Sequence, residues 1–298
     1  MTATSIAQPP AFRKAPPLDD LLIELYCLLH EELPAQRWGR PRGTNEAELV
    51  TLAVAQMLLD CPKERVFLRR APARLGHLFP HLPSRPQYNK RVRAAGPLLV
   101  RALTLLAQRH PNTLDDLLLI DSTSVPAGTS RATARRSNLV DTAAYGRQVV
   151  QHRFYWGYKL MIAISPDGFP VAFDLVPANT SEQNALRAIL PRLPLPGRTV
   201  LGDQGFAGRA IRAEVAAAGG TLLLSDGKKP TLPLRRIRQR VETVFVTLKG
   251  QLSLERHGGR TIAAVTARIL ARLLALAAVL WHGGNHGRPG RHVAAYDY

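Results

Sequence analysis

The spacing of apolar residues divides the chain into a helical first third and a mixed remainder. Between residues 18 and 110 the apolar positions follow helical spacing and are punctuated by capping residues. The expected helices begin at Asp19 or Asp20, after a Thr44 or Asn45 cap, at Lys63, and after Pro86, the last running on through Leu106. This region is therefore predicted to be all-helical.

The pattern changes at residue 111, where short apolar runs predict strands. The expected strands are Leu117–Ile120, Tyr158–Ile164, Val171–Val176, Arg198–Leu201 and Thr221–Leu224. Helices are expected after Ser181, over Ala210–Ala218 and over Arg235–Lys249. Strands that pair first and then alternate with helices predict a mixed α/β sheet. Residues 131–159 are basic and poorly periodic, which predicts a loop that closes over DNA.

One long apolar stretch, Thr261–Trp281, must be assigned to a membrane or to the core. Arg268 and Arg272 interrupt it four residues apart, on one helical face. Arginine near the centre of a bilayer is costly. We therefore expect a core helix with a basic edge and no membrane span.

Charge narrows the class of partner. The chain has 298 residues with 40 Lys+Arg against 22 Asp+Glu, a formal net charge of +18. This excess favours a polyanion, nucleic acid first, with a ribosomal or membrane-surface protein as the alternative. Two isolated cysteines, Cys27 and Cys61, form neither a disulfide framework nor a zinc cluster, which predicts a reducing cytoplasm.

Three carboxylates stand out in this basic chain. Asp121 and Asp203 each end an apolar run, and Glu242 lies on the basic helix predicted over residues 235–249. A carboxylate just past a buried strand is costly unless something uses it. Phosphodiester cleavage uses two divalent ions about 3.5–4 Å apart. Because Mg²⁺ prefers oxygen ligands, three carboxylates suit it or Mn²⁺.

Cations lie around these carboxylates in the sequence. Arg238, Glu242 and Lys249 fall on one face of the predicted helix, which suits DNA phosphates. Lys159 follows aromatic residues at the start of a strand, where it could clamp a DNA end. The short N-terminal helices, with several arginines between them, fit a helix-turn-helix DNA reader and a plain helical bundle equally well.

Several short strings together resemble the DDE transposases of bacterial insertion sequences, most closely the insertion sequence 982 family. The strings are Ile120-Asp121-Ser122, Tyr145-Gly146, Phe154 to Leu160, Pro177-Ala178-Asn179-Thr180, Gly202-Asp203-Gln204-Gly205-Phe206 and Arg238-Gln239-Arg240-Val241-Glu242. The resemblance implies a ribonuclease H-like mixed sheet with flanking helices, preceded by the helical region. It also implies that Asp121, Asp203 and Glu242 bind two Mg²⁺ or Mn²⁺ ions.

The resemblance further implies cutting and joining of double-stranded DNA at the element's terminal inverted repeats and in target DNA. The enzyme is expected to be a homo-oligomer, a dimer on DNA, and to act in the bacterial cytoplasm at the nucleoid. Arg238 and Lys249 match the family's last-helix signature, but its tyrosine position holds Arg235, which suggests a phosphate contact. The expected parts are a flexible tail (1–17), a DNA-binding or dimerisation region (18–110), a catalytic domain (111–283) and a C-terminal tail (284–298).

Two other functions remain compatible with these residues. One is a catalytically silent DNA-binding protein derived from a transposase. The other is a metal-dependent nuclease that cuts without strand transfer. Both would retain the same fold and the same cationic surface.

Overall fold

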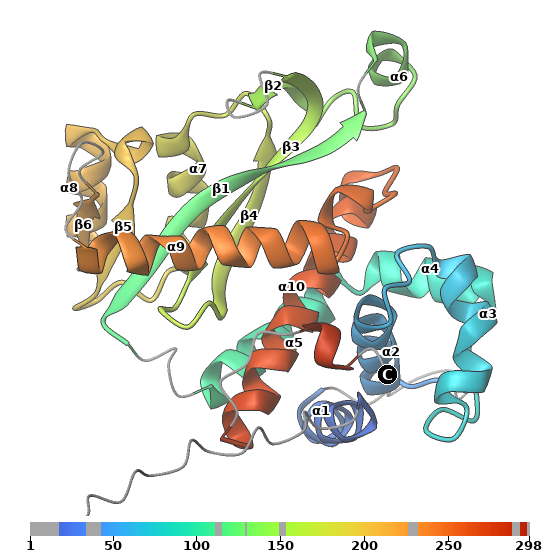
Figure 1. The fold of residues 1–298 in the computed structure, drawn as a ribbon. Coiled ribbons are helices and arrows are strands. Elements are labelled where there is room, and N and C mark those ends of the chain that lie inside the picture. Colours follow the sequence, from blue (N-terminus) through green and yellow to red (C-terminus); the bar gives the residue numbers. More distant parts are fainter. Residues whose placement is uncertain are drawn as a thin grey trace, which may run out of the picture.

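The computed structural model describes residues 18–33, 43–110, 115–128, 130–148, 153–225, 232–287 and 293–296, and the predicted N-terminal tail lies outside them. A six-stranded sheet occupies one half of the molecule, and the helices from the first third of the chain form the other (Figure 1). The long C-terminal helix connects the two halves, because it packs against helices of the first third and also contacts β4 of the sheet.

The helical region has five helices among the described residues, which are α1 (Leu18–Glu32), α2 (Glu46–Leu58), α3 (Glu64–Leu75), α4 (Arg85–Ala94) and α5 (Gly96–Arg109). The predicted cap of the second helix is confirmed. The Asn45 side chain accepts a hydrogen bond from the Glu48 N–H at 2.8 Å, and Glu48 accepts one from the Asn45 N–H at 2.6 Å. This reciprocal pair satisfies two backbone donors at the start of α2.

The prediction of a single long helix after Pro86 is wrong. The chain forms α4 and α5 instead, with the break at Ala95 and Gly96. Pro97 lacks the N–H that would continue α4, and its ring would clash with the carbonyl one turn back. The apolar spacing continued across this break, so the periodicity alone concealed it.

The strands are β1 (Leu117–Gly128), β2 (Ala144–Gln148), β3 (Arg153–Ile164), β4 (Pro170–Pro177), β5 (Thr199–Gly202) and β6 (Thr221–Leu224). Their order is β2–β3–β1–β5–β6, and β4 also pairs with β3. β3 is antiparallel to β1, whereas β5 and β6 run parallel to it. Four strands joined by antiparallel pairs, β1 to β4, followed by the two parallel strands β5 and β6 confirm the expected ribonuclease H-like mixed sheet.

The loop predicted over residues 131–159 is also wrong. This stretch contains helix α6 (Arg131–Arg135), strand β2 and the first half of β3. β2 is a short strand with exposed Tyr145 and Arg147, so little apolar alternation marks it. Gly146 allows its close approach, because a Cβ there would lie 2.8 Å from the Ala178 carbonyl oxygen.

Helices cover both faces of the sheet. Helices α7 (Glu182–Ile189) and α8 (Arg209–Ala217) bury one face through a cluster that includes Leu118, Ile120 and Val200. The other face, with Leu119 and Val125, joins a second cluster shared with α9 (Leu232–Val246), α10 (Ile262–Asn285) and the N-terminal helices. Neighbouring residues of β1 thus serve opposite cores, as strand alternation requires.

Helix α10 is long and apolar enough to cross a membrane by length and composition, but most of that stretch is buried inside the protein. It packs against α1, α2, α4 and α5. The prediction of a core helix is therefore confirmed. Beyond α10, Val293–Tyr296 form a short 3-10 turn, and the Tyr296 hydroxyl lies 3.1 Å from Nδ1 of the buried His282.

Arg272 is fully buried in α10, where the sequence suggested a basic edge. Its guanidinium donates to the carbonyls of Leu252 at 2.8 Å, Ser253 at 3.2 Å and Arg268 at 2.7 Å. Burial lowers the pKa of Arg272 to about 10, so the side chain remains charged at neutral pH. Ser253, whose carbonyl accepts one of these hydrogen bonds, adopts a left-handed backbone conformation with a φ of 51°. Arg272 therefore ties the turn after α9 to the core helix.

We predict that Arg272→Leu lowers the free energy of unfolding by about 2–4 kcal/mol, because buried carbonyls lose charged donors. Urea unfolding followed by circular dichroism measures the change. The control is Arg187→Leu, which removes an ion pair with Glu214 between half-exposed side chains and should have little effect. An unchanged midpoint for Arg272→Leu would contradict the assigned role.

Candidate active site

The register of β1 and β5 places Asp121 beside Asp203. These strands are parallel, and Leu119 lies opposite Leu201 at the last β1–β5 pair. Each aspartate comes two residues after its member of that pair. Since paired strands lie about 4.8 Å apart, the two carboxylates lie side by side at the same level, Asp121 within β1 and Asp203 just past the end of β5.

A tight turn at the end of β5 holds Asp203. Gly202 permits it, because a Cβ there would lie 2.8 Å from the Phe206 ring and 3.1 Å from the Ile120 side chain. The chain then enters the 3-10 turn η3 (Gln204–Phe206), which Asp203 caps. Its Oδ1 accepts a hydrogen bond from the Gly205 N–H at 2.9 Å. This bond fixes the direction of the carboxylate.

A further carboxylate, Glu182, joins the two aspartates. It lies in the first turn of α7, which Ser181 caps as predicted. Its Oε1 accepts hydrogen bonds from Ser122 Oγ at 3.1 Å and from Lys159 Nζ at 2.6 Å. Its Oε2 is buried and has no hydrogen-bond partner among the described residues. A buried carboxylate oxygen without a donor is costly unless a ligand satisfies it.

Burial, and to a smaller extent neighbouring charges, shift the ionisation of Asp121. Burial raises the pKa of Asp121 from 3.8 to about 7. The Ser122 N–H lowers this pKa, whereas the charges of Asp203 and Glu182 raise it further. The Arg238 guanidinium also lowers it. Strong perturbation by burial and specific charged neighbours is typical of functional sites.

Helix α9 crosses the sheet over β1 and carries the other predicted residues (Figure 1). Arg238 donates to Ser225 Oγ at 2.7 Å, just past β6, and its charge acts on Asp121. Glu242 lies one helical turn further along α9. Its side chain is exposed, and among the described residues it forms no hydrogen bond or ion pair.

The remaining cations predicted to contact DNA differ in their surroundings. Lys249 lies in the π-helical turn η4 (Thr247–Gln251), where Nζ is 3.4 Å from Ser124 Oγ and 3.1 Å from Glu255. Lys159 is mostly buried and bonded to Glu182 and to the Thr180 carbonyl. Arg235 belongs to α9, but its side chain lies outside the described residues.

The donor set fits a hard divalent cation. Asp121, Asp203 and Glu182 offer carboxylate oxygens only, the ligands that Mg²⁺ and Mn²⁺ prefer. The buried Oε2 of Glu182 and the raised pKa of Asp121 both indicate negative charge that the surrounding protein leaves incompletely compensated. A bound cation would compensate it.

The family model of the transposase DDE domain matches residues 112–278, which include all of these side chains. The chain belongs to the DDE transposase family. No curated protein matches it. Enzymes of this family act on DNA and generally use divalent metal ions. The match thus agrees with the donor set at the edge of the sheet.

Glu182 is the carboxylate next to Ser122 and Lys159 that the sequence reasoning missed. Its position after Ser181 explained it as an ordinary acidic residue in the first turn of a helix. The local sequence showed only that Glu182 closely follows the end of a predicted strand, β4 in the structure, which pairs with β3 beside β1. Only the paired sheet shows that this helix starts next to Asp121.

We predict that Asp121→Asn stabilises the metal-free protein at high pH. The folded pKa of Asp121, about 7, exceeds the unfolded value of 3.8, so its contribution to stability is present below pH 4 and is lost as the pH rises through 7. The variant should exceed wild type most at pH 8. The gap should narrow by up to about 1.4 kcal/mol per pH unit between pH 7 and 4.

Urea unfolding with a chelator present at pH 8, 6 and 4.5 measures this gap. The matched control is Asp141→Asn, an exposed aspartate in a turn, whose difference from wild type should stay constant with pH. A constant gap for Asp121→Asn as well would show that Asp121 is not buried against other negative charges.

Proposed function

We propose that this DDE transposase cleaves and joins DNA at the terminal inverted repeats of an insertion sequence, one similar to the insertion sequence 982 family. The observation that carries the proposal is the placement of Asp121 and Asp203 two residues beyond the last β1–β5 pair, with Glu182 close enough to act on Asp121. The chain around this acidic point has a net charge of +18, which suits a DNA substrate.

In this proposal Asp121, Asp203 and Glu242 hold two divalent ions, and Glu182 adds a fourth carboxylate next to Asp121. Divalent ions bound there supply charge neutralisation at phosphorus and activate the attacking oxygen. Because Asp121 must be ionised to bind a cation, protons compete for it below about pH 7. Lys159 orients Glu182 through its 2.6 Å bond and acts as a positioning residue.

The cations on and after α9 position the DNA strand. The charge of Arg238 acts on Asp121, so its guanidinium can contact a phosphate next to the scissile one. Lys249 lies beside Ser124, which is further along β1 than Asp121, and contacts a neighbouring phosphate of the DNA strand. Arg235 lies about one turn before Arg238 on the same helix. These contacts orient the strand for an in-line attack, first by water and then by the freed 3′-hydroxyl.

We further propose that the transposase acts as a homo-oligomer, a dimer on DNA, in the bacterial cytoplasm. Two ends of one element must be held together for joining, and two copies of the chain provide two sites. Target DNA then enters where both freed 3′-hydroxyls can reach it.

The test is strand transfer of a pre-cut terminal-repeat duplex into plasmid DNA with Mg²⁺ or Mn²⁺. Asp121→Asn, Asp203→Asn, Glu242→Gln and Glu182→Gln should each lower the rate by at least about 100-fold, or about 2.7 kcal/mol of transition-state stabilisation. Glu31→Gln, at an exposed position of α1, is the matched control and should react like wild type.

Three results would contradict the proposal in different ways. Wild-type rates in the Asp121 and Asp203 variants would remove the active-site assignment. Cleavage without joining would make the protein a nuclease. Binding of terminal-repeat DNA without any metal-dependent cleavage would make it a catalytically silent DNA-binding protein.

A further inference from the structure

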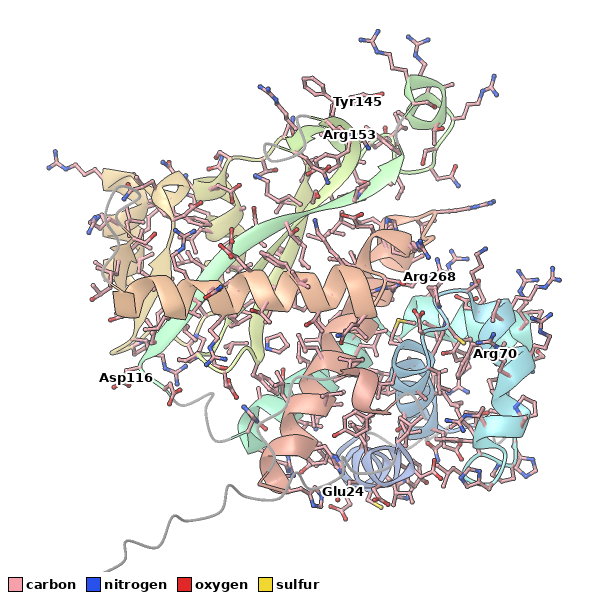
Figure 2. All side chains as sticks on the ribbon, in the orientation of Figure 1. Glu24, Arg70, Asp116, Tyr145, Arg153 and Arg268 are labelled. Carbon is pink, nitrogen blue, oxygen red and sulfur yellow. The ribbon has the colours of Figure 1, made fainter. Side chains whose placement is uncertain are left out.

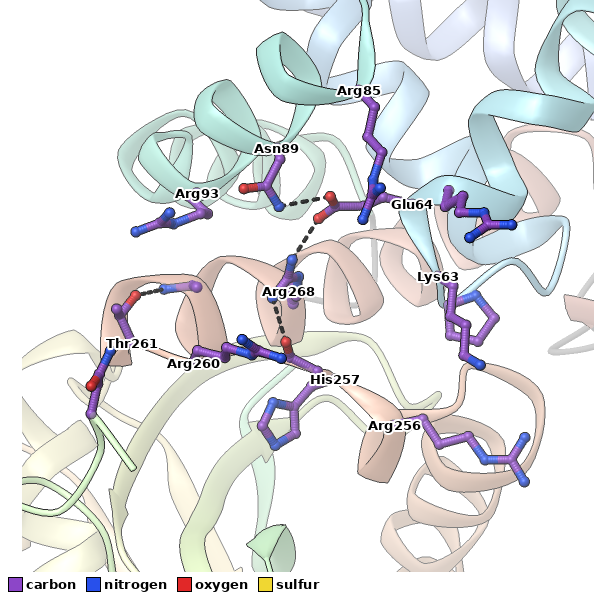
Figure 3. A pocket seen from close by; sticks show the side chains of 15 residues that line it. Lys63, Glu64, Arg85, Asn89, Arg93, Arg256, His257, Arg260, Thr261 and Arg268 are labelled. Carbon is purple, nitrogen blue, oxygen red and sulfur yellow. Dashed lines mark hydrogen bonds and ion pairs between the residues drawn. The ribbon is translucent and has the colours of Figure 1, made fainter. Parts of the chain in front are cut away.

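A cationic cleft lies between the helical region and the segment that leads into α10 (Figure 3). It has a volume of about 750 Å³. One wall comes from the start of α3 and from α4, and the other from the turn before α10. Its exposed cationic side chains are Lys63, Arg65, Arg85, Arg93, Arg256 and Arg260.

This positive charge is not neutralised within the described part of the chain. Glu64 is the acidic residue that lines the cleft, and it already accepts hydrogen bonds from Arg268 at 2.6 Å and Asn89 at 2.7 Å. Among the described residues, none of the six exposed cations forms an ion pair. Side chains of like charge that converge on one cleft repel each other unless an anion joins them.

The cleft is rigidly connected to the strand that carries Asp121. His257 is buried at its floor, where Nε2 lies 3.1 Å from the Pro126 carbonyl oxygen of β1. Its Nδ1 accepts a hydrogen bond from the Gly259 N–H at 3.1 Å. Nε2 therefore carries the proton and donates it to Pro126. Burial lowers the pKa of His257 to about 4, so this link persists at neutral pH.

The Arg268–Glu64 ion pair connects the two walls. Arg268 belongs to α10 and Glu64 to α3, and both side chains are largely buried. Arg268 also donates to the Gly258 carbonyl at 2.9 Å. The cleft therefore does not depend on a ligand for its shape, and its exposed arginines are presented from fixed elements on both sides (Figure 3).

We propose that this cleft grips the phosphate backbone of duplex DNA outside the active site. Pro126, to which the cleft is bonded through His257, lies five residues beyond Asp121 on β1, roughly 17 Å at about 3.4 Å per residue. That a cut lies at Asp121 rests on the proposed function, whereas the binding of DNA by the cleft does not.

Binding is tested by fluorescence anisotropy with a labelled mixed-sequence duplex of about 30 base pairs, roughly 100 Å long. A chelator prevents cleavage, and salt is varied from about 50 to 200 mM. The test variant is Arg93→Ala/Arg260→Ala, with one substitution on each wall. The control is Arg69→Ala/Arg74→Ala, which removes equal charge from exposed positions of α3 outside the cleft.

The slope of log affinity against log salt should fall by about two in the cleft variant, because each lost phosphate contact removes about 0.9. Its affinity should fall at least tenfold at the higher salt, while the control binds like wild type. On a duplex that carries the element end, an uncharged methylphosphonate moved one phosphate at a time away from the cut should weaken binding by wild type at a position where it does not weaken binding by the cleft variant.

An unchanged salt slope in the cleft variant would overturn the proposal, as would an equal loss in the α3 control. Both variants should keep the wild-type melting temperature, since all four side chains are exposed. If wild type cleaves DNA but the cleft variant binds normally, the DNA-binding role of the cleft is wrong and the proposed function stands. If wild type never cleaves DNA but the cleft variant shows the predicted loss of slope, the proposed function is wrong and the DNA-binding role of the cleft stands.

Discussion

The parallel register between β1 and β5 is the constraint on which the site depends. Leu119 opposite Leu201 brings Asp121, within β1, and Asp203, just past the end of β5, to the same level. The register is held from both sides, because neighbouring residues of β1 belong to opposite apolar cores. A slip of one residue would exchange those faces and separate the carboxylates, so the packing of the sheet enforces the proximity of two like charges.

This proximity has an energetic cost that the surrounding elements only partly offset. Arg238 approaches from α9 and Lys159 from β3, yet the pKa of Asp121 remains at about 7 and one oxygen of Glu182 has no donor. The protein thus keeps negative charge at one point although the chain as a whole carries a net charge of +18. A cation bound at that point would neutralise the carboxylates, and DNA phosphates around it would neutralise the positive charge of the chain.

The parts of the fold that follow from local signals were predictable. The cap at Asn45, the core helix and most strands were expected from capping chemistry and apolar runs, and Asp121 and Asp203 from their positions after such runs. The break between α4 and α5 was missed because apolar spacing continues across it. β2 was missed because its exposed tyrosine and arginine resemble a polar loop.

Glu182 could not be found by the same reasoning, because its role depends on contacts between distant segments. Ser122 and Lys159, on two different strands, bring it to the site. The cationic cleft arises in the same way, since its arginines come from segments more than 150 residues apart that α10 holds together. Local patterns predicted the elements, whereas their convergence is a property of tertiary packing.

The central claim is that Asp121 and Asp203 share one metal site. Titration calorimetry of Mn²⁺ into the protein at pH 8 tests it most directly, because it requires neither DNA nor turnover. The account predicts binding by wild type that is lost or weakened in both Asp121→Asn and Asp203→Asn, each of which remains folded. Equal Mn²⁺ binding by wild type and both variants would contradict it.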